Sequence, residues 1–442
     1  MASLAKTMLL GLLGLAIALI AQVVLRRDSP TTSEVSQPYT CPPLSEAAAL
    51  ERFAGLISFP TVSNASSEDH VNDQKVFRDM VAYLARSYPR VWRRLKVEHV
   101  GRVGENELSL LITWTGSRPE LPAVLFVSHY DVVPVTPGSE GEWTHPPFSG
   151  KIADGYVWGR GSLDIKFGVA GLLQAASVLL GGEGEEDVEE DVAVFRPERT
   201  LMFAFGHDEE VSGSHGAATI ASLLRSRGVE LDVVVDEGGA ILEDGLRPFT
   251  SRAVAMVGTA EKGYTTVEVT LRAPGGHSSM PTTDGSDIAA QLWRLLGAVR
   301  RSTTPTRLQA PVTDMLTHVA PYTSGWMRLL LSGAERGGPI KWLLAQVFRR
   351  LGGRETAAMV ANTLALTRVR GGVADNVLPQ EAVLSFNGRL LPGSTPGELV
   401  EALKAAVKVA GVAAEVAEVK RIWECSVEKL FLAAATSGIW QF

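Results

Sequence analysis

The sequence predicts an α/β fold: a mostly parallel β-sheet domain with an inserted, smaller α+β domain. Short apolar runs alternate with helical patterns up to residue 262, which is typical of a sheet covered by helices on both faces. Strands with period-two alternation follow later in the chain. The 442 residues are also too many for one ordinary core, so two domains are expected.

The composition is that of a globular protein with no general affinity for nucleic acid. The chain is 45% hydrophobic and 21% charged, with a net charge of -7 and a pI near 5.7. A nucleic-acid-binding protein needs a basic face, which this balance does not provide. The run from Gly181 to Asp191 has seven acids and no base, which predicts a solvated loop. Metal binding by that run is the alternative.

The N-terminal 27 residues are predicted to be a signal peptide or signal-anchor. Met8–Leu25 is an uncharged apolar segment of 18 residues, followed by two arginines. Residues 28–43 form a polar linker. A signal of this kind predicts the secretory pathway, with the protein secreted or membrane-anchored and its catalytic domain lumenal or extracellular. Cys41 and Cys425 give no disulfide framework, and a single bridge between them is an option in that compartment.

Three short apolar runs between residues 44 and 262 predict buried parallel strands. They are Val124–Ser128, Leu201–Gly206 and Leu231–Val235, with helical patterns at residues 165–180 and 216–228. In such sheets, ligands bind beyond the carboxyl ends of the strands. Each run leads into polar residues of the kind that build a site: His129, Asp131, Asp208, Glu209, Glu210, Asp236 and Glu237.

The pattern changes after Lys262, and residues 263–411 predict the smaller α+β domain. Residues 263–273 and 381–390 alternate with period two, as half-exposed antiparallel strands do. A helix is expected after Thr395, because Thr395 can cap it and Pro396 suits its first position. Glu398 would complete a capping box with Thr395.

The segment from Trp326 to Arg354 is both apolar and basic. An amphipathic helix pair within the small domain explains this composition. The alternative is a lid that contacts acyl chains or a membrane surface.

The chemistry-bearing residues suggest a metal site. The chain has no G-x-S-x-G elbow, no H-E-x-x-H helix and no Walker loop. One imidazole with several carboxylates suits zinc or a similar divalent ion, and one carboxylate can bridge two metals. The residues that offer these ligands are His129, Asp131, Asp164, Glu209, Glu210 and Asp236.

Each of these residues also has an ordinary explanation. Asp164 can cap the helix that follows it, and Glu209 and Glu210 can be solvated turn residues. His129 can be a hydrogen-bonded histidine at a strand end. Their joint occurrence at successive strand ends favours a site.

Five segments, taken in order, resemble the M20 metallopeptidase family. They are "HYDVVPV…EWTHPPFSG", "VWGRGSLDIK", "GHDEEVSGSHGA", "VVDEGG" and "GGHSSMP". The resemblance runs from about Leu44 to Gly411 and is greatest to the branch of N-fatty-acyl-amino-acid synthase/hydrolases and carboxypeptidase S. It implies a zinc-exopeptidase-like catalytic domain begun by residues 44–262. A lid or dimerisation domain, residues 263–411, would interrupt it.

The resemblance implies two zinc ions per subunit. His129 and Asp236 would hold one ion, and Asp164 would bridge to the second, which Glu210 would ligate. The motif alignment prefers Asp236 to Glu237, although either carboxylate can ligate a metal.

Further roles follow from the same resemblance. Glu209 would be the general base. Asp131 would accept the other N–H of His129 and fix its tautomer. Asp208 is expected to be only a polar turn residue.

Three residues of the small domain match positions that contact the substrate in the family. His277 matches a histidine that reaches the site of a partner subunit and stabilises the developing oxyanion. Asn376 and Arg389 match positions that hold the carboxylate end of the substrate. The ordinary explanations are a surface histidine in a turn for His277 and an exposed ion-paired strand residue for Arg389.

The chain departs from the family in one respect. The second zinc of the family also uses a late histidine, but the last of the eight histidines here is His318. Residues 412–442 are therefore expected to be a truncated return to the catalytic domain. This predicts weak occupancy of the second metal site, with low activity or stability.

The sequence thus predicts a zinc-dependent amidohydrolase that cleaves or forms the amide bond of N-acyl, preferably fatty-acyl, amino acids. A carboxypeptidase S-like peptidase acting on short peptides is the alternative, and a non-catalytic M20-like protein is a third hypothesis. The expected partners are a small acyl-amino acid or short peptide and a second copy bound through the lid. A membrane anchor is expected only if the signal is not cleaved.

Overall fold

A computed structural model describes residues 44–102, 106–181, 195–247, 249–302, 304–323, 325–335, 338–351 and 353–423. The apolar segment Met8–Leu25, most of the acidic run and both cysteines lie outside these residues. Within the described part, no helix is long and apolar enough to cross a membrane.

The described chain divides into two compact units, a first unit of residues 44–237 and a second unit of residues 238–423. Residues 238–262, which the sequence pattern joined to the first domain, group with the second unit.

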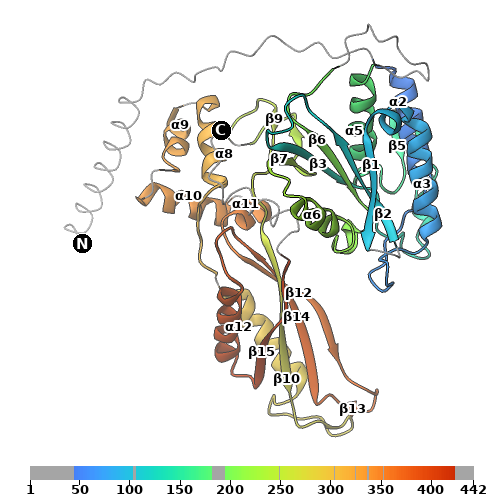
Figure 1. Ribbon diagram of the computed structural model, residues 1–442. Coiled ribbons are helices and arrows are strands. Elements are labelled where there is room, and N and C mark those ends of the chain that lie inside the picture. The colour runs from blue at the N-terminus through green and yellow to red at the C-terminus, as the bar shows by residue number, and fades with distance from the viewer. Residues whose placement is uncertain are drawn as a thin grey trace. The chain divides into compact units, whose positions relative to one another are not determined.

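The first unit is built on a five-stranded sheet of order β1-β2-β6-β3-β7 (Figure 1). β3 is parallel to both β6 and β7, whereas β1 and β2 add an antiparallel edge. The predicted fold class and the three predicted buried strands are confirmed. The strands are β1 (Lys96–Arg102), β2 (Asn106–Trp114), β3 (Ala123–His129), β6 (Leu201–Gly206) and β7 (Leu231–Val235).

Alternate residues of the central strands pack against helices on opposite faces of this sheet. Phe203 and Phe205 of β6 join a core on one face, and Ala204 joins a core on the other face. Because successive side chains of a strand point to opposite faces, both faces of an apolar run need a cover. The first core includes residues of α3 (Gln74–Ser87), α4 (Pro89–Arg94) and α5 (Lys166–Leu179), and the second includes residues of α6 (Ala217–Ser226).

A buried lysine joins α2 (Glu46–Ile57) to the start of α5. The Nζ of Lys166 donates hydrogen bonds to the carbonyls of Leu56, at 3.3 Å, and Phe59, at 2.6 Å. Burial lowers the pKa of Lys166 to about 7. These hydrogen bonds fix the segment before α5, and that segment carries Asp164. The remaining short elements of the unit are β4 (Lys151–Ala153) and β5 (Tyr156–Trp158).

The second unit contains an antiparallel sheet of order β12-β14-β10-β15. The predicted strands are β10 (Gly263–Arg272) and β14 (Glu381–Leu390), with β12 (Thr363–Gly371) beside them. β15 (Ala414–Trp423) pairs with β10. The structure therefore places residues 414–423 in this sheet, whereas the sequence pattern joined them to the catalytic domain.

Two helices complete this α+β arrangement: α7 (Ile288–Arg301) and α12 (Pro396–Ala410). α12 begins at Pro396 as predicted, but the capping box is wrong, because the side chain of Thr395 makes no capping hydrogen bond. The Glu398 carboxylate instead accepts from Arg307, at 3.1 Å, and Asn362, at 3.3 Å.

The described residues between 325 and 354 form helices at 325–332 and 338–351 and the start of a third helix at 353. Leu331, Leu344 and Phe348 are buried in a core of their own. The prediction of amphipathic helices is thereby confirmed, and the apolar residues on these helices are explained by that core. The helices of this part are α8 (Val312–Val319), α9 (Gly325–Ser332), α10 (Gly338–Leu351) and α11 (Gly353–Met359).

Lys262 ties this helical part to β10 and gives a prediction for pH-dependent stability. Its Nζ donates to the carbonyls of Ala358, at 3.0 Å, and Ala361, at 2.8 Å. Burial, with a smaller effect of Arg389, lowers the pKa of Lys262 from 10.5 to about 8. The unfolded chain therefore binds more protons than the folded chain between about pH 8 and 10, so stability rises with pH in that window.

Replacing Lys262 by methionine removes this titration. We expect the free energy of unfolding of the wild type, relative to Lys262→Met, to increase from pH 8 to 10, by less than the limiting slope of about 1.4 kcal/mol per pH unit. Chemical denaturation at several pH values measures it. Lys404→Met, on the exposed side of α12, is the control and should show no such slope. Parallel curves for the wild type and Lys262→Met would contradict the prediction.

Candidate metal centre

The candidate site lies beyond the carboxyl ends of three neighbouring parallel strands of the first unit. His129 ends β3 and pairs in register with Gly206, which ends β6. The segment after β6 continues into a short 3-10 turn, Glu209–Val211, and β7 ends at Val235. The topology therefore brings residues that are far apart in the sequence to one edge of the sheet.

His129 is the centre of this arrangement. The side chain is buried, and its Nε2 has no hydrogen-bond partner among the residues that the structure describes. Three carboxylate oxygens face this atom: Asp164 Oδ1 at 3.3 Å, Glu237 Oε2 at 3.5 Å and Glu209 Oε2 at 3.7 Å. Burial opposes protonation of His129, but the nearby carboxylates of Asp131, Glu237 and Glu209 raise its pKa to about 11. An imidazole so placed is suited to a cation.

Asp131 links His129 to the turn that carries Glu209 and Glu210. Its carboxylate accepts the backbone N–H groups of Glu209, at 3.0 Å, and Glu210, at 3.1 Å. The Nδ1 of His129 lies 3.3 Å from Asp131 Oδ1 and 3.1 Å from the Asp131 carbonyl oxygen. Asp131 is fully buried, so it fixes both the ring of His129 and the turn that carries the two glutamates.

Asp164 is free of the capping role that its position before a helix suggested. The N-cap of α5 is Ile165, which makes no side-chain capping bond. The Asp164 side chain is 67% exposed, with one oxygen directed to His129.

The two glutamates of the turn have raised pKa values. Burial is the main cause for each. The pKa of Glu209 rises to about 7, with the carboxylates of Glu237 and Asp131 adding to the shift against the opposing effect of His129. A carboxylate whose pKa lies near neutral pH is suited to general acid–base chemistry. Glu210 has a similar environment, with Asp164 as the second cause.

After β7, the structure brings Glu237 to His129, whereas the motif alignment favoured Asp236. The metal-compatible group consists of His129, Asp164 and Glu237, whose ligand atoms all lie within 4.8 Å of one another. Asp236 Oδ1 accepts the backbone N–H of Glu237 at 2.8 Å. Among the described residues, neither Asp236 nor Glu210 belongs to a group of this kind.

A second group of possible ligands, not noticed in the sequence, consists of His70, Asp208 and His215. Asp208 is buried and makes more contacts than the polar turn residue that the sequence predicts. Its carboxylate accepts the N–H groups of His215, at 2.9 Å, and Gly216, at 2.8 Å, and contacts Nδ1 of His70 at 2.9 Å. The rings of His70 and His215 stack at 4.0 Å. Asp208 therefore anchors the loop after Glu210.

A further buried histidine lies next to this group. The Nδ1 of His207 lies 2.6 Å from Ser109 Oγ, and burial lowers the pKa of His207. The spacing His207-Asp208…His215 was visible in the sequence, but His70 is too distant in the chain to be linked to it without the fold.

In the second unit, His277 and Asn376 lie together. β11 (Gly276–His277) pairs with β13 (Val377–Leu378), and the N–H of Ser278 donates to the Asn376 carbonyl at 3.0 Å. The backbone N–H of Ser279 donates to Nδ1 of His277 at 3.2 Å. Since Nδ1 accepts, the neutral ring carries its proton on Nε2, which can donate outwards.

Arg389 lies on β14 in the four-stranded sheet, which is separate from the ribbon of β11 and β13. Its guanidinium packs over the ring of Tyr264, 5.0 Å from the centroid. Glu381 and Arg389 occupy opposite ends of β14, a span of roughly 26 Å at the usual rise per residue. The sheet thus separates Arg389 from the pair of His277 and Asn376.

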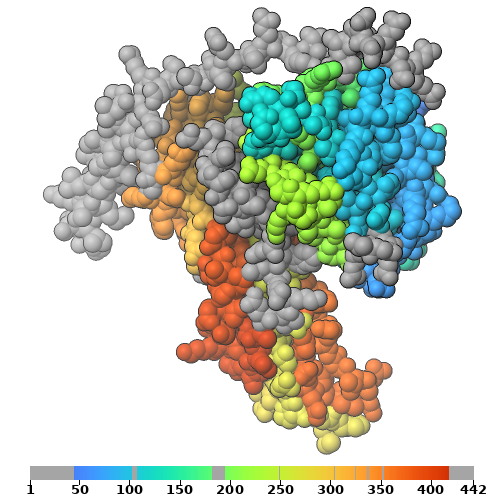
Figure 2. All heavy atoms as spheres, in the orientation of Figure 1, coloured from blue at the N-terminus to red at the C-terminus, as the bar shows by residue number. Residues whose placement is uncertain are grey.

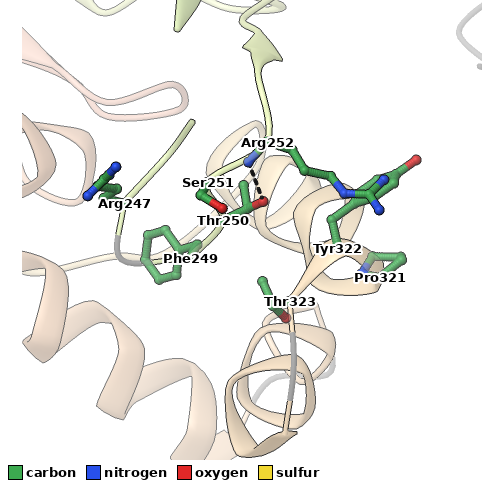
Figure 3. Close-up of a pocket in the computed structure, with 8 residues that line it drawn as sticks. All are labelled: Arg247, Phe249, Thr250, Ser251, Arg252, Pro321, Tyr322 and Thr323. Carbon is green, nitrogen blue, oxygen red and sulfur yellow. Dashed lines mark hydrogen bonds between the residues drawn. The ribbon is translucent and has the colours of Figure 1, made fainter. Parts of the chain in front are cut away.

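A cavity of about 710 Å³ in the second unit is a different kind of site (Figure 3). The described residues that line it include no histidine, cysteine or carboxylate, the side chains that bind most metal ions. Arg252 extends over the ring of Tyr322, and its backbone N–H donates to Thr250 Oγ1 at 3.1 Å. Arg247 points away from that pair in Figure 3, so the two guanidinium groups do not converge.

The residues around His129 fit a divalent cation. The buried Nε2 without a partner and the facing carboxylates of Asp164 and Glu237 form a nitrogen and oxygen donor set. Such donors suit zinc and similar divalent ions. Without a cation, these carboxylates would repel one another.

Comparisons with known proteins support the resemblance seen in the sequence. Residues 125–426 match the sequence family described as Peptidase family M20/M25/M40. The N-fatty-acyl-amino acid synthase/hydrolase PM20D1 of Xenopus tropicalis is 33% identical over 364 residues, which cover 81% of this chain and 65% of that protein. Carboxypeptidase S of Saccharomyces cerevisiae is 31% identical over 81% of this chain and 60% of its own length. The resemblance carried by the ordered motifs is confirmed.

A solved structure shows the same fold. The M20 family metallo-carboxypeptidase Sso-CP2 of Sulfolobus solfataricus matches with a TM-score of 0.50 at 18% identity, covering 85% of this chain and 78% of that one. The chain spans about two thirds of the length of the curated relatives it matches.

Proposed function

Because this chain belongs to peptidase family M20/M25/M40, we propose that it is a zinc-dependent amidohydrolase acting on N-acyl amino acids, with fatty-acyl groups preferred. The observation that carries the proposal is the buried, unpartnered Nε2 of His129 facing the carboxylates of Asp164, Glu209 and Glu237. The acyl-amino-acid substrate is supported by the 33% identity to an N-fatty-acyl-amino acid synthase/hydrolase.

The residues of the first unit would divide the work. His129, Asp164 and Glu237 would hold the metal, Glu210 would complete a second position beside Asp164, and Asp131 would orient His129. A bound divalent cation supplies Lewis acidity, which polarises an amide carbonyl and makes a water molecule more acidic.

Glu209 would move the proton. It would accept a proton from the water that attacks the carbonyl carbon and then deliver it to the amine that leaves. Its raised pKa suits both steps. The Nε2–H of His277 would donate to the oxygen on which negative charge develops.

Asn376 and Arg389 would bind the carboxylate of the amino acid. Since the sheet keeps Arg389 far from the ribbon of His277 and Asn376, one substrate would meet all three only if two copies of the chain contribute. A homodimer formed through the second unit is part of the proposal. The apolar segment Met8–Leu25 supports a secretory route for it.

A second candidate function is a carboxypeptidase acting on short peptides, favoured by the similarity to carboxypeptidase S. To separate the two, we propose measuring the turnover of N-oleoyl-phenylalanine and Gly-Phe by the full chain. We expect faster turnover of the acyl amino acid, its loss on chelation and its return with Zn²⁺. Preferred turnover of Gly-Phe would support the peptidase, and turnover unaffected by chelation would refute the metal site.

A further inference from the structure

A second cavity of the second unit, of about 420 Å³, lies beside the ribbon that carries His277. Its volume falls within the range of about 300–1,000 Å³ typical of small-molecule sites. The start of α7, the end of β12 and the β13 segment enclose it. It is lined by Pro281, Thr282, Asp287, Ile288, Ala289, Leu292, Val369, Gly371, Leu378, Pro379 and Ala382.

The polar side chains of this lining are already engaged. Thr282 Oγ1 donates to Asp287 Oδ2 at 3.1 Å, and Asp287 Oδ1 accepts the N–H of Ala290 at 3.0 Å, which caps α7. The rest of the lining is apolar. A hydrocarbon chain therefore loses no hydrogen bond on entering, whereas an anionic head group would meet the carboxylate of Asp287.

The rim of the cavity is also apolar and exposed. Val369 lines the cavity and is 53% exposed. Pro281 and Ala289 of the lining are exposed as well. The cavity is therefore reached from solvent past apolar residues.

The cavity and the predicted substrate-binding residues share one ribbon. His277 pairs with Val377, and the next residue, Leu378, lines the cavity. In Figure 1 this ribbon, marked by β13, lies at the free end of the sheet of the second unit. Figure 2 shows segments near residues 280 and 370 meeting at that end. Since one strand residue spans about 3.3 Å, a chain extending from an amide near His277 reaches the cavity within a few ångströms.

We infer that this cavity receives the acyl chain of the substrate. The inference rests on the proposed function and makes the cavity the part of the protein that selects long acyl groups over short ones. A short acyl group held near His277 does not reach the cavity and leaves the cavity unfilled. The ligand is the uncharged hydrocarbon of an N-acyl amino acid, with the carboxylate remaining outside.

The test fills the cavity from an exposed helical position. Ala289→Trp places an indole at the lining of the cavity, and Ala405→Trp on the exposed side of α12 is the matched control. Val369→Asp is a second variant, which puts a charge at the rim. The kcat/KM for N-oleoyl-phenylalanine, divided by that for N-acetyl-phenylalanine, is compared among the variants. Binding of N-oleoyl-phenylalanine is measured directly by calorimetry.

We expect Ala289→Trp and Val369→Asp to lower the oleoyl-to-acetyl ratio and the oleoyl affinity at least tenfold, because each methylene excluded weakens binding about fourfold. Ala405→Trp should leave both within twofold. Ratios and affinities that stay within twofold in both cavity variants overturn the inference. The sedimentation coefficient of each variant is measured as well. If the cavity variants change only this coefficient, and neither the ratio nor the affinity, the cavity is an interface between copies and the inference is overturned.

The two proposals can fail separately. Unchanged ratios in an enzyme that hydrolyses both substrates refute the acyl-chain cavity alone. Absence of hydrolysis together with cavity-dependent binding of N-oleoyl-phenylalanine refutes the hydrolytic function and supports the cavity.

Discussion

Replacing Glu209 by glutamine should lower kcat for N-oleoyl-phenylalanine by roughly 10²- to 10⁴-fold, the contribution of a positioned general acid–base. The amide keeps the size of the side chain but cannot take a proton from water. Glu209 is 3.7 Å from Nε2 of His129, and the metal-compatible group does not include it. The backbone N–H of Glu209 should still bind Asp131, so the turn should persist.

The experiment measures kcat together with the zinc content of Glu209→Gln. Unchanged zinc with lost turnover identifies Glu209 as the base. Glu142→Gln, in an exposed short helix of the same unit, is the control and should behave as wild type. If Glu209→Gln retained more than a tenth of the turnover, or lost its zinc, the proton-transfer role would be refuted.

Much of the fold was predictable because local patterns and burial agree. The apolar runs that became β3, β6 and β7 are short and continuous, as expected for strands covered on both faces. Their order in the sheet brings His129 to the turn that carries Glu209 and Glu210. The general rule that sites form at the carboxyl ends of parallel strands therefore sufficed to predict where these residues meet.

The predictions that the structure corrects depend on tertiary contacts, which the local sequence pattern does not contain. Glu398 has the right spacing for a capping box, but Arg307 and Asn362 compete for its carboxylate. Asp208 looked like a turn residue because its partner, His70, lies 138 residues away. Residues 412–442 are predicted to return to the catalytic domain because they follow the lid, whereas the backbone of residues 414–423 pairs with β10.

The choice between Asp236 and Glu237 depends on a single residue step. Both residues lie just beyond the end of β7, at Val235, where the strand pattern no longer sets the direction of a side chain. The alignment of motifs cannot sense this direction. The structure directs Glu237 Oε2 towards His129 at 3.5 Å, while Asp236 Oδ1 accepts the N–H of Glu237.

We therefore expect Glu237→Gln to raise the Kd for Zn²⁺ by about 10- to 100-fold or more. Removing a residue that only hydrogen-bonds to a metal ligand already weakens metal binding by about that factor. Asp236→Asn should raise it less than threefold. Competition with a chromophoric chelator measures both affinities, and thermal unfolding with and without Zn²⁺ gives a readout independent of catalysis. The opposite ranking of the two variants would favour Asp236 as the ligand, because losing a direct ligand weakens metal binding more than changing a neighbouring residue does.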